Sequence, residues 1–423
     1  MAVLAALTPR DIEVRFYDDR LEQIPFDEPT DLVAMTVETY TARRAYQIAS
    51  EYRKRRVPVV MGGFHPSLCP DEVVRFADTI VQGEAEGLWE QLLDDYRRGT
   101  PQKIYQHPSR PVLNGLLPRR DIFLGKRYLP LSLVEAGRGC TMPCDFCAIQ
   151  SAYQATHHQR PLEAITAEIE SLRQYRRSFF FVDDNLALDT VYASELLRAI
   201  TPLRIRWLGQ MSVTAAQDEK LVELLQRSGC AGVLIGFESL RQQGLAAMRK
   251  PFNLGPDSYR QAMANFRRHG IGVFGTFVFG YEHDTAGTVA EALEFAQEEG
   301  FYLAAFNHLV PFPGTPVYRR LGAENKLLSA QWWMDPDYRF NQVAFRPGAI
   351  DPAELRERCL AARHAFYSTR STWRRYRMLA RQLTVKEKAV FWALNLMHRA
   401  EVRQRDGFPL GDESWQGQLL EAN

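Results

Sequence analysis

The stretch Gly137-Arg-Gly-Cys-Thr-Met-Pro-Cys-Asp-Phe-Cys-Ala148 places three cysteines within eight residues. Cys140, Cys144 and Cys147 have the spacing C-x3-C-x2-C, and cysteine thiolate is the usual ligand of iron–sulfur clusters. Three thiolates can hold three irons of a [4Fe-4S] cluster and leave the fourth iron without a protein ligand. Because an open coordination position distinguishes a catalytic metal site from a closed structural one, the spacing predicts a catalytic cluster with these cysteines as metal ligands.

Other uses of the three cysteines agree less well with the surrounding residues. Three thiols on one face of a helix would be core residues, but Pro143 within the stretch favours a loop. A structural zinc site needs a fourth ligand, and the remaining cysteines, Cys69, Cys230 and Cys359, are solitary and far apart. Disulfides need an oxidising compartment, and six cysteines in 423 residues without a secretory signal do not indicate one.

Length and composition limit the class of protein. A chain of 423 residues suggests two or three domains, and 46% apolar with 24% charged residues are the proportions of a soluble globular protein. The net charge of +1 gives no general attraction to nucleic acid, and no apolar run reaches the ~18 residues of a membrane span, so neither partner is expected. The N-terminus lacks a basic leader, so cytoplasmic localisation is predicted.

Residues 1–105 alternate short apolar runs with amphipathic segments, the pattern of a parallel sheet flanked by helices. Strands are predicted at 13–17, 32–36, 57–61 and 79–82, and helices at 2–7, 42–56 and 88–96. Ligands on such sheets bind at the carboxyl ends of the strands, which makes the loops 36–40, 62–67 and 83–86 candidate binding loops. The pattern begins in the helix at 2–7, so this Rossmann-like domain is expected to lack its first strand.

The rest of the chain predicts a second α/β domain and a helical region. Residues 106–130 read as a proline-containing linker, and residues 131–323 alternate strands with helices as in a partial (β/α)6 barrel of the TIM type. The six strands are expected at 131–135, 179–182, 205–208, 232–235, 273–279 and 304–309. Residues 324–423 are predicted to be mostly helical.

Polar residues and glycines mark the carboxyl ends of these barrel strands, where catalytic groups of such barrels lie. They are Asp183, Asp184 and Asn185, then Gln210 and Ser212, then Glu238, then Gly275 and Gly280, and finally the turn 311–316. Adjacent carboxylates that follow an apolar strand are costly unless they bind something. A helix N-cap would explain one of them, and Gln210 and Ser212 are equally suited to serve their own loop.

The cysteine triplet, followed in order by these segments, resembles the radical S-adenosylmethionine (SAM) superfamily. The loops of residues 1–105 resemble the cobalamin-binding domain of its B12-dependent class B, the group of the anaerobic magnesium-protoporphyrin ester cyclase and of cobalamin-dependent methylases. This resemblance implies that the open iron binds SAM, and that one-electron reduction cleaves SAM to a 5′-deoxyadenosyl radical. The D-x-H-x-x-G motif, which supplies a cobalt-binding histidine in some cobalamin proteins, is absent.

The resemblance also implies roles for single residues. Phe146 is the usual aromatic of the cysteine motif near the adenine, and Asp183-Asp184-Asn185 stands where a Gly-Gly-Glu turn accepts hydrogen bonds from the SAM ammonium. Glu238 is expected near the cofactor or its positioning arginines. Further cofactor-binding residues are expected to be Gln210 and Ser212, Gly275 and Gly280 beside adenine, and Thr36, Thr39, His65 and Gly83 beside cobalamin. His65 is equally suited to cap its own loop.

These features predict an enzyme that cleaves SAM and functionalises an unactivated carbon of a small molecule, by cobalamin-dependent C-methylation. The alternative is a cobalamin-independent oxidation, cyclisation or rearrangement with a vestigial B12-type domain. A non-catalytic iron–sulfur or zinc protein would leave the strand-end carboxylates without a purpose. A one-electron reductant such as flavodoxin or ferredoxin is an expected partner. The basic, aromatic segment 367–377 either contacts an anionic lipid surface or acidic substrate, or docks its aromatic rings on the barrel.

Overall fold

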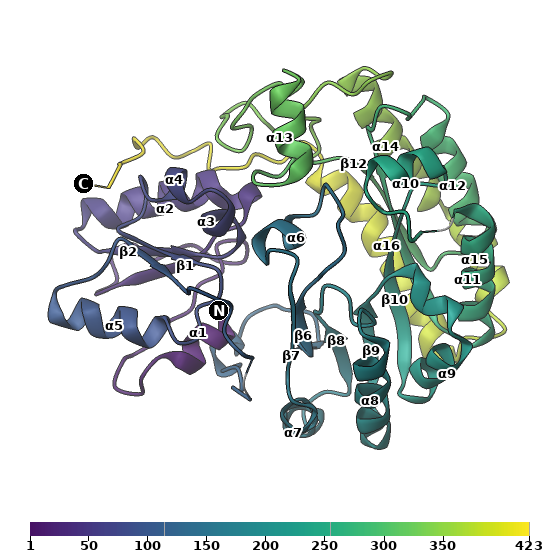
Figure 1. The fold of residues 1–423 in the computed structure, drawn as a ribbon, viewed down its shortest axis with the longest axis horizontal. Coiled ribbons are helices and arrows are strands. Elements are labelled where there is room, and N and C mark those ends of the chain that lie inside the picture. The colour runs from purple at the N-terminus through teal and green to yellow at the C-terminus, as the bar shows by residue number, and fades with distance from the viewer. Residues whose placement is uncertain (114, 254, 423) are drawn as a thin grey trace.

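The computed structural model describes residues 1–113, 115–253 and 255–422. Figure 1 shows a smaller N-terminal sheet at the left and a larger sheet at the right, with the hairpin that carries the cysteine segment between them. Both larger sheets are parallel and have helices packed on them, which confirms the predicted α/β class. None of the described helices is both long and apolar enough to cross a membrane.

The N-terminal sheet is built from short, buried, β-branched runs. Its strands pair in parallel in sequence order: β1 (Val33–Thr36), β2 (Val59–Gly62), β3 (Thr79–Gln82) and β4 (Ile104–Gln106). Its helices are α1 (Ala2–Leu7), α2 (Ala42–Lys54), α3 (Phe64–Leu68), α4 (Pro70–Val73) and α5 (Trp89–Arg98), with a 3-10 turn η1 (Thr39–Thr41). The predicted helices and three of the predicted strands are confirmed.

Two details of this domain differ from the prediction. The strand expected at 13–17 is wrong, because this extended segment pairs with no sheet edge. Phe16 instead packs edge-to-face on Phe123 of the segment between the domains, with ring centroids 5.3 Å apart. Strand β4 was not predicted, because three residues flanked by lysine and histidine carry too little apolar pattern to mark a strand.

The larger sheet has the six predicted strands in the predicted order. They are β5 (Ser132–Val134), β8 (Ser178–Phe181), β9 (Arg206–Gln210), β10 (Cys230–Glu238), β11 (Gly272–Phe279) and β12 (Leu303–His308), all parallel. The helices after these strands are α7 (Leu162–Arg173), α8 (Thr190–Ile200), α9 (Glu219–Arg227), α10 (Gln242–Ala247), α11 (Pro256–Arg268), α12 (Thr288–Glu298) and α13 (Pro316–Ala323). Three 3-10 turns also lie in or before this region: η2 (Asp121–Phe123), η3 (Thr201–Leu203) and η4 (Val213–Gln217). Strands β5 and β12 form the two edges, so the barrel is open as predicted.

Alternation along β11 shows how the barrel separates core from cavity. Val273 and Phe277 are buried with the core cluster, whereas Phe274 and Val278 point to the opposite face and line a cavity. Successive side chains of a strand face opposite sides of its sheet. One strand therefore supplies both the packing under the outer helices and a wall of the inner cavity.

A short antiparallel hairpin carries the cysteine segment. Its strands are β6 (Gly137–Gly139) and β7 (His157–Gln159), and the loop between them contains the cysteines and α6 (Ala148–Ala152). The hairpin was not predicted, because three-residue strands rich in glycine and histidine give no periodic signal. It holds both ends of the cysteine loop beside the larger sheet.

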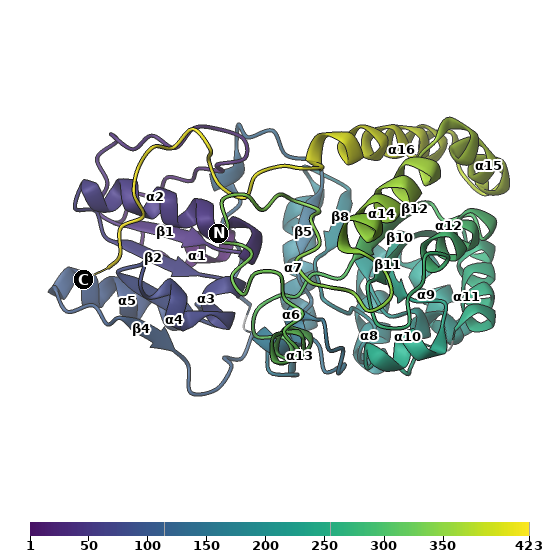
Figure 2. The same ribbon diagram turned by 90° about the horizontal axis from the view of Figure 1, so that it is seen from above.

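The C-terminal region is helical in its middle part only. The helices are α14 (Pro352–Phe366), α15 (Thr369–Leu379) and α16 (Val385–Arg405), and Figure 2 shows them beside the β12 end of the barrel. Residues 327–350 and 406–422 contain no helix, which corrects the prediction there. Trp332 and Trp333 join the core of the N-terminal domain, and the backbone of Asp412 hydrogen-bonds the Gln47 side chain. These segments are irregular because they fill the surface of another domain.

Tyr367 and Arg375 of the segment 367–377 dock on the barrel, whereas Trp373 and Tyr376 pack against Trp392 of α16. Tyr367 is buried, and its hydroxyl donates to the Ala304 carbonyl at 2.8 Å. Arg375 is fully buried and donates to the Phe301 carbonyl at 3.0 Å. Of the two interpretations of this segment, the structure therefore supports docking against the barrel.

Candidate active site

Asp183 and Asp184, at the end of β8, fix the entry to the cysteine loop by hydrogen bonds. Asp183 accepts hydrogen bonds from the backbone N–H groups of Ala136 at 2.9 Å and Gly137 at 2.6 Å. Asp184 accepts one from the N–H of Gly139 at 2.8 Å. Burial raises the pKa of Asp183 to about 7, and the two N–H donors oppose this rise. Both carboxylates therefore fix the chain that enters the cysteine loop.

This arrangement changes the role expected for Asp183. Both of its oxygens are occupied by backbone donors and its side chain is buried, so it offers no free carboxylate to a ligand ammonium. Asn185 lies close to the Cys140 thiol. Burial raises the pKa of Cys140, and a hydrogen bond with Asn185 offsets part of this rise. Of the three residues that follow β8, Asp183 and Asp184 position the loop and Asn185 contacts a thiol.

Gln210 and Ser212 connect strand ends to one another. The Gln210 side chain donates to the Asp184 carbonyl at 3.0 Å, and the Ser212 N–H donates to the Asn185 side chain at 3.2 Å. The Ser212 hydroxyl caps η4 by accepting from the N–H of Thr214. The interpretation that these residues serve their own loop therefore describes their observed contacts.

Glu238 is paired with a lysine that the sequence analysis did not single out. Lys250 donates to the Glu238 carboxylate at 2.8 Å and to the Gly236 carbonyl at 2.9 Å, and both charged side chains are buried. Glu238 has a left-handed backbone with φ 62°, at a bulge in β10, and a side chain at Gly236 would collide with its carboxylate. Burial raises the pKa of Cys144, and the positive charge of Lys250 offsets part of this rise. The Glu238–Lys250 pair therefore lies near the cysteines. The sequence could not identify Lys250 as a site residue, because a single lysine in a loop belongs to no recognisable motif.

Gly275 and Gly280 are required by packing within the protein, and their role beside adenine stays a prediction. A Cβ at Gly275 would overlap the ring of Phe301, a core residue. Gly280 has φ 113°, its N–H donates to Asp284 at 2.7 Å, and a Cβ there would meet Phe345. The glycine spacing of this strand follows from the aromatic core around it.

Replacing Gly275 with alanine is expected to lower the free energy of unfolding by about 1–3 kcal/mol, because Phe301 must move to admit the methyl group. Gly287 is a matched control, since a Cβ there makes only ordinary contacts at 3.7 Å or more and Gly287→Ala should change stability little. Urea unfolding of the two variants measures the difference. A Gly275→Ala variant with normal stability but weakened SAM binding would support the adenine assignment.

On the N-terminal domain, His65 does not face a ligand, which corrects its assignment. The ring is fully buried, with Nε2 3.1 Å from the Glu72 carboxylate and Nδ1 3.3 Å from the Thr39 hydroxyl. Thr39 is therefore also occupied. Thr36 is exposed, and Gly83 has φ 77° with open space around it, so these two remain on the accessible surface of the loops.

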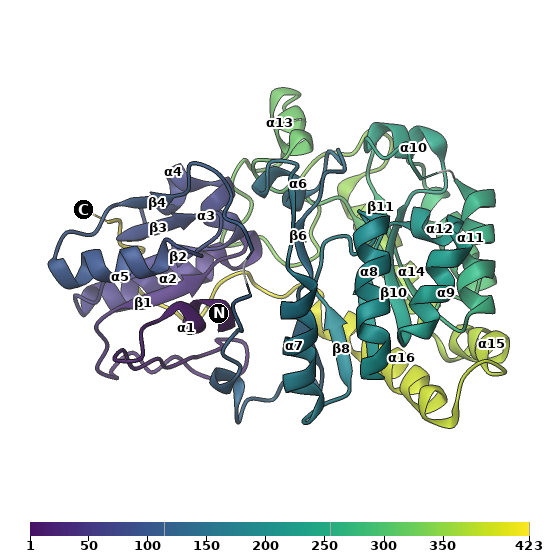
Figure 3. The same cartoon turned by 60° about the horizontal axis from the view of Figure 1, so that its bottom comes forward.

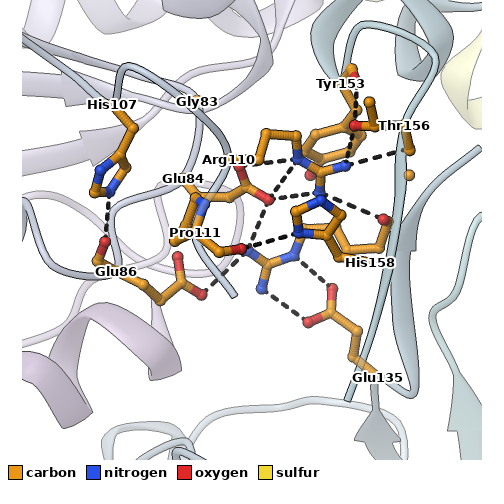
Figure 4. Close-up of polar contacts among 12 residues, drawn as sticks. Gly83, Glu84, Glu86, His107, Arg110, Pro111, Glu135, Tyr153, Thr156 and His158 are labelled. Carbon is orange, nitrogen blue, oxygen red and sulfur yellow. Dashed lines mark hydrogen bonds and ion pairs between the residues drawn. The ribbon is translucent and has the colours of Figure 1, made fainter. Parts of the chain in front are cut away.

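A partly buried ionic network joins the loop 83–86 to the hairpin of the cysteine loop (Figure 4). Arg110 forms hydrogen bonds to Glu84 at 3.0 Å and to the Thr156 hydroxyl at 2.8 Å. Arg138, in β6, lies 3.1 Å from Glu86. Arg138 also forms a bidentate ion pair with Glu135, with hydrogen bonds of 3.0 and 2.8 Å. The binding loop of one domain is thereby tied to the cysteine segment of the other, which the sequence could not indicate because the partners lie far apart along the chain.

A cavity of about 460 Å³ lies between the two domains and the C-terminal helices. Its wall includes Phe146 of the cysteine loop, Tyr40 of the N-terminal domain and Phe274 of β11. Phe146, expected beside a cofactor, thus faces a space large enough for a small molecule. The cavity connects the cysteine loop with the loop 36–40 of the other domain.

Comparison with known proteins agrees with this arrangement. Residues 134–296 match the model of the Radical SAM superfamily. The chain is 28% identical over 378 residues to bacteriochlorophyllide d C-12(1)-methyltransferase of Chlorobaculum tepidum, covering 87% of this chain and 82% of that protein. It is also 28% identical over 353 residues to the C-8(2)-methyltransferase of the same organism, covering 79% of this chain and 77% of that protein.

A solved structure extends the likeness of fold to nearly the whole chain. The radical SAM methyltransferase TsrM from Kitasatospora setae, determined with cobalamin and a [4Fe-4S] cluster bound, superimposes with a TM-score of 0.61. The match covers 93% of this chain and 83% of that chain at 18% sequence identity, a level at which the likeness concerns the fold. This protein is therefore an enzyme that matches the Radical SAM superfamily over residues 134–296 and is similar over most of its length to methyltransferases.

Proposed function

We propose that this enzyme is a cobalamin-dependent C-methyltransferase that activates an unactivated carbon of a small molecule by radical SAM chemistry. The observation that carries the proposal is the position of the three cysteines. They lie on one loop at the carboxyl edge of the barrel, beside a cavity that reaches the cobalamin-type domain. When bound, the cofactors supply a 5′-deoxyadenosyl radical and a transferable methyl group. The protein positions them and keeps water away from the reacting carbon.

The donor set suits an iron–sulfur cluster. Burial raises the pKa of all three thiols, that of Cys144 to about 12, so metal binding must displace their protons. Within residues 1–113, 115–253 and 255–422, no three His, Cys, Asp or Glu side chains form a group that could hold one metal ion. A cubane distributes its thiolates over separate irons, so this arrangement favours a cluster over a mononuclear zinc site.

SAM would bind at the fourth iron, close to Asn185, Glu238 and Phe146. Asn185 hydrogen-bonds Cys140, and the Glu238–Lys250 pair lies beside Cys144. Lys250 hydrogen-bonds the Glu238 carboxylate and fixes its position. Because Gly236 has no side chain, there is room for this carboxylate. We propose that an external one-electron reductant such as flavodoxin or ferredoxin supplies the electron that starts the reaction.

Cobalamin would lie on the loops that contain Thr36 and Gly83. The TsrM structure contains cobalamin, and the two loops are accessible in the corresponding sheet of this chain. Arg138 and Arg110 hold the loop 83–86 to the cysteine hairpin, which would keep cobalamin on these loops close to the cluster. A methyl group must reach a carbon that also lies near the SAM-derived radical, which requires the two cofactors to lie close together.

Titration of the anaerobically reconstituted protein with hydroxocobalamin is expected to give a complex that survives gel filtration. Its absorption spectrum should lack an imidazole ligand to cobalt, because His65 is buried between Glu72 and Thr39. The spectrum of His65→Gln should therefore equal that of the wild type. Loss of cobalamin during gel filtration, with SAM cleavage intact, would favour the cobalamin-independent alternative.

The overall activity is tested by anaerobic turnover with SAM and reductant. The expected products are 5′-deoxyadenosine and a substrate that is heavier by one methyl group, detected by mass spectrometry with methyl-labelled SAM. A product oxidised or cyclised without the labelled methyl group would contradict methylation and leave the radical step standing.

A further inference from the structure

The cavity between the domains has one charged wall residue without an opposite charge. Its charged or titratable residues include Arg405, Glu401 and His398 of α16, and Glu401 lies 2.9 Å from Arg405 and 3.2 Å from His398. Arg363 of α14 also lines the cavity, and no carboxylate of the described residues forms an ion pair with it. Asp406, an acid in its vicinity, is paired with Arg356 at 2.6 Å.

Arg363 is held only by neutral groups. Its Nε donates to the Phe306 carbonyl at 2.9 Å, Nη2 to the Asn307 side chain at 2.7 Å and Nη1 to the Asn341 side chain at 3.3 Å. Partial removal from water lowers the pKa of Arg363, as expected for a charge with incomplete solvation. A partly buried charge that lacks a counter-charge is unfavourable, so its position in a cavity wall indicates an anionic ligand.

The hydrogen bonds of Arg363 leave room for that ligand. A guanidinium carries five N–H donors, and the three bonds to Phe306, Asn307 and Asn341 use three of them. One N–H on each terminal nitrogen has no partner among the residues that the structure describes. Two such donors in a fixed plane match the two oxygens of a carboxylate. The two amide side chains hold the guanidinium in a fixed orientation.

The remaining walls describe the body of the ligand. They are mainly apolar and aromatic, with Tyr40, Phe146, Phe274, Phe312, Phe340 and Tyr367 among them. Figure 3 shows that strand β11 and the helices α14 and α16, which carry part of this wall, lie close together. A volume of about 460 Å³ is within the range of small-molecule sites. Aromatic walls pack favourably on the faces and edges of an aromatic ring.

We infer that the substrate is an aromatic, largely apolar molecule with a carboxylate, and that Arg363 anchors this carboxylate. The inference rests on the proposed function, because it takes the cavity beside Phe146 as the substrate site. The anchor fixes the orientation of the substrate at the α14 side of the cavity. Its other end then points along the cavity toward the cysteine loop.

The test uses the anaerobically reconstituted full chain and two fluorescent probes, 1-pyrenebutyrate and its uncharged amide. Fluorescence anisotropy should show that the wild type binds the carboxylate about 10- to 100-fold more tightly than the amide, as expected for charge-assisted hydrogen bonds. Arg363→Gln should remove this preference and leave the affinity for the amide within about threefold. Retained amide binding shows that the cavity of the variant is still folded.

Two further variants make the test specific. Arg405→Gln is the matched control, since Arg405 lines the same cavity but is already paired with Glu401, and it should keep most of the preference. Ala305→Phe fills the cavity and should weaken binding of both probes about tenfold or more. Unchanged carboxylate binding in Arg363→Gln, equal binding of both probes by the wild type, or no binding of either would overturn the inference. Tighter binding of 1-pyrenyl phosphate than of the carboxylate would also overturn it.

The same preparations separate this inference from the proposed function. Iron content and formation of 5′-deoxyadenosine from SAM are measured without any probe. A protein that cleaves SAM but shows no carboxylate preference keeps its proposed function and loses the anchor. A protein that shows the preference but holds no cluster keeps the anion site and loses the proposed function.

Discussion

Cys144→Ala is expected to abolish the cluster and to lower the formation of 5′-deoxyadenosine from SAM by about a thousandfold or more, because no reduction of SAM occurs without it. Cys140→Ala and Cys147→Ala should have the same effect. Each change removes one of three thiolates on a loop whose entry is fixed by Asp183 and Asp184, and the other cysteines belong to other segments of the chain. Iron and sulfide analysis with anaerobic SAM cleavage measures both quantities.

Cys230→Ala and Cys359→Ala are the controls for this prediction. Both thiols are buried in the barrel core, and burial raises the pKa of each to about 12. They belong to the packing of β10 and α14, so their variants should keep full iron per folded protein even where stability falls. A Cys144→Ala protein that retained four irons would show that the cysteine loop is not the cluster site.

Lys250→Met is expected to lower the free energy of unfolding by about 3–5 kcal/mol, because it leaves the Glu238 carboxylate buried without a counter-charge. The double variant Glu238→Gln/Lys250→Met should recover at least half of this loss, since it removes both charges. The exposed pair Arg241–Glu291 has a similar distance, 2.7 Å, and serves as the matched control. Arg241→Met should cost less than about 1 kcal/mol.

Urea unfolding of the wild type and the three variants without cofactors measures these differences. The double variant then separates stability from function, because it restores folding but lacks the charged pair beside Cys144. It should hold the cluster and bind SAM more weakly than the wild type. The prediction fails if Lys250→Met is no less stable than Arg241→Met.

Elements with a local pattern were predictable from the sequence. The six barrel strands consist of apolar runs, and Asp183, Glu238 and the cysteines stand where those runs stop. A parallel strand that is buried on both faces must be apolar throughout, so a polar residue marks its end. This reasoning located the candidate site at the carboxyl edge of the barrel without any long-range information.

The roles of single residues at that edge were less predictable. The sequence suggested a cofactor contact for each of three residues, which the structure places against other parts of the protein. They are His65, which contacts Glu72, Gly275, which packs against Phe301, and Asp183, which accepts from the Gly137 N–H. The same residue type serves a ligand or a neighbouring segment equally well. Only the identity of the partner distinguishes the two uses, and the partner of Asp183 lies 46 residues away in the chain.

The sequence by itself determined the class of fold, the order of the barrel strands and the three candidate ligands of a cluster, because each depends on residues that are close together in the chain. Only the tertiary structure decided which polar residues remain free for ligands. Arg363 illustrates the reason: on a helix with several arginines it looks like a solvated side chain. Its partly buried position beside a cavity, with neutral hydrogen-bond partners from β12 and residue 341 among the described residues, arises when segments distant in sequence pack together.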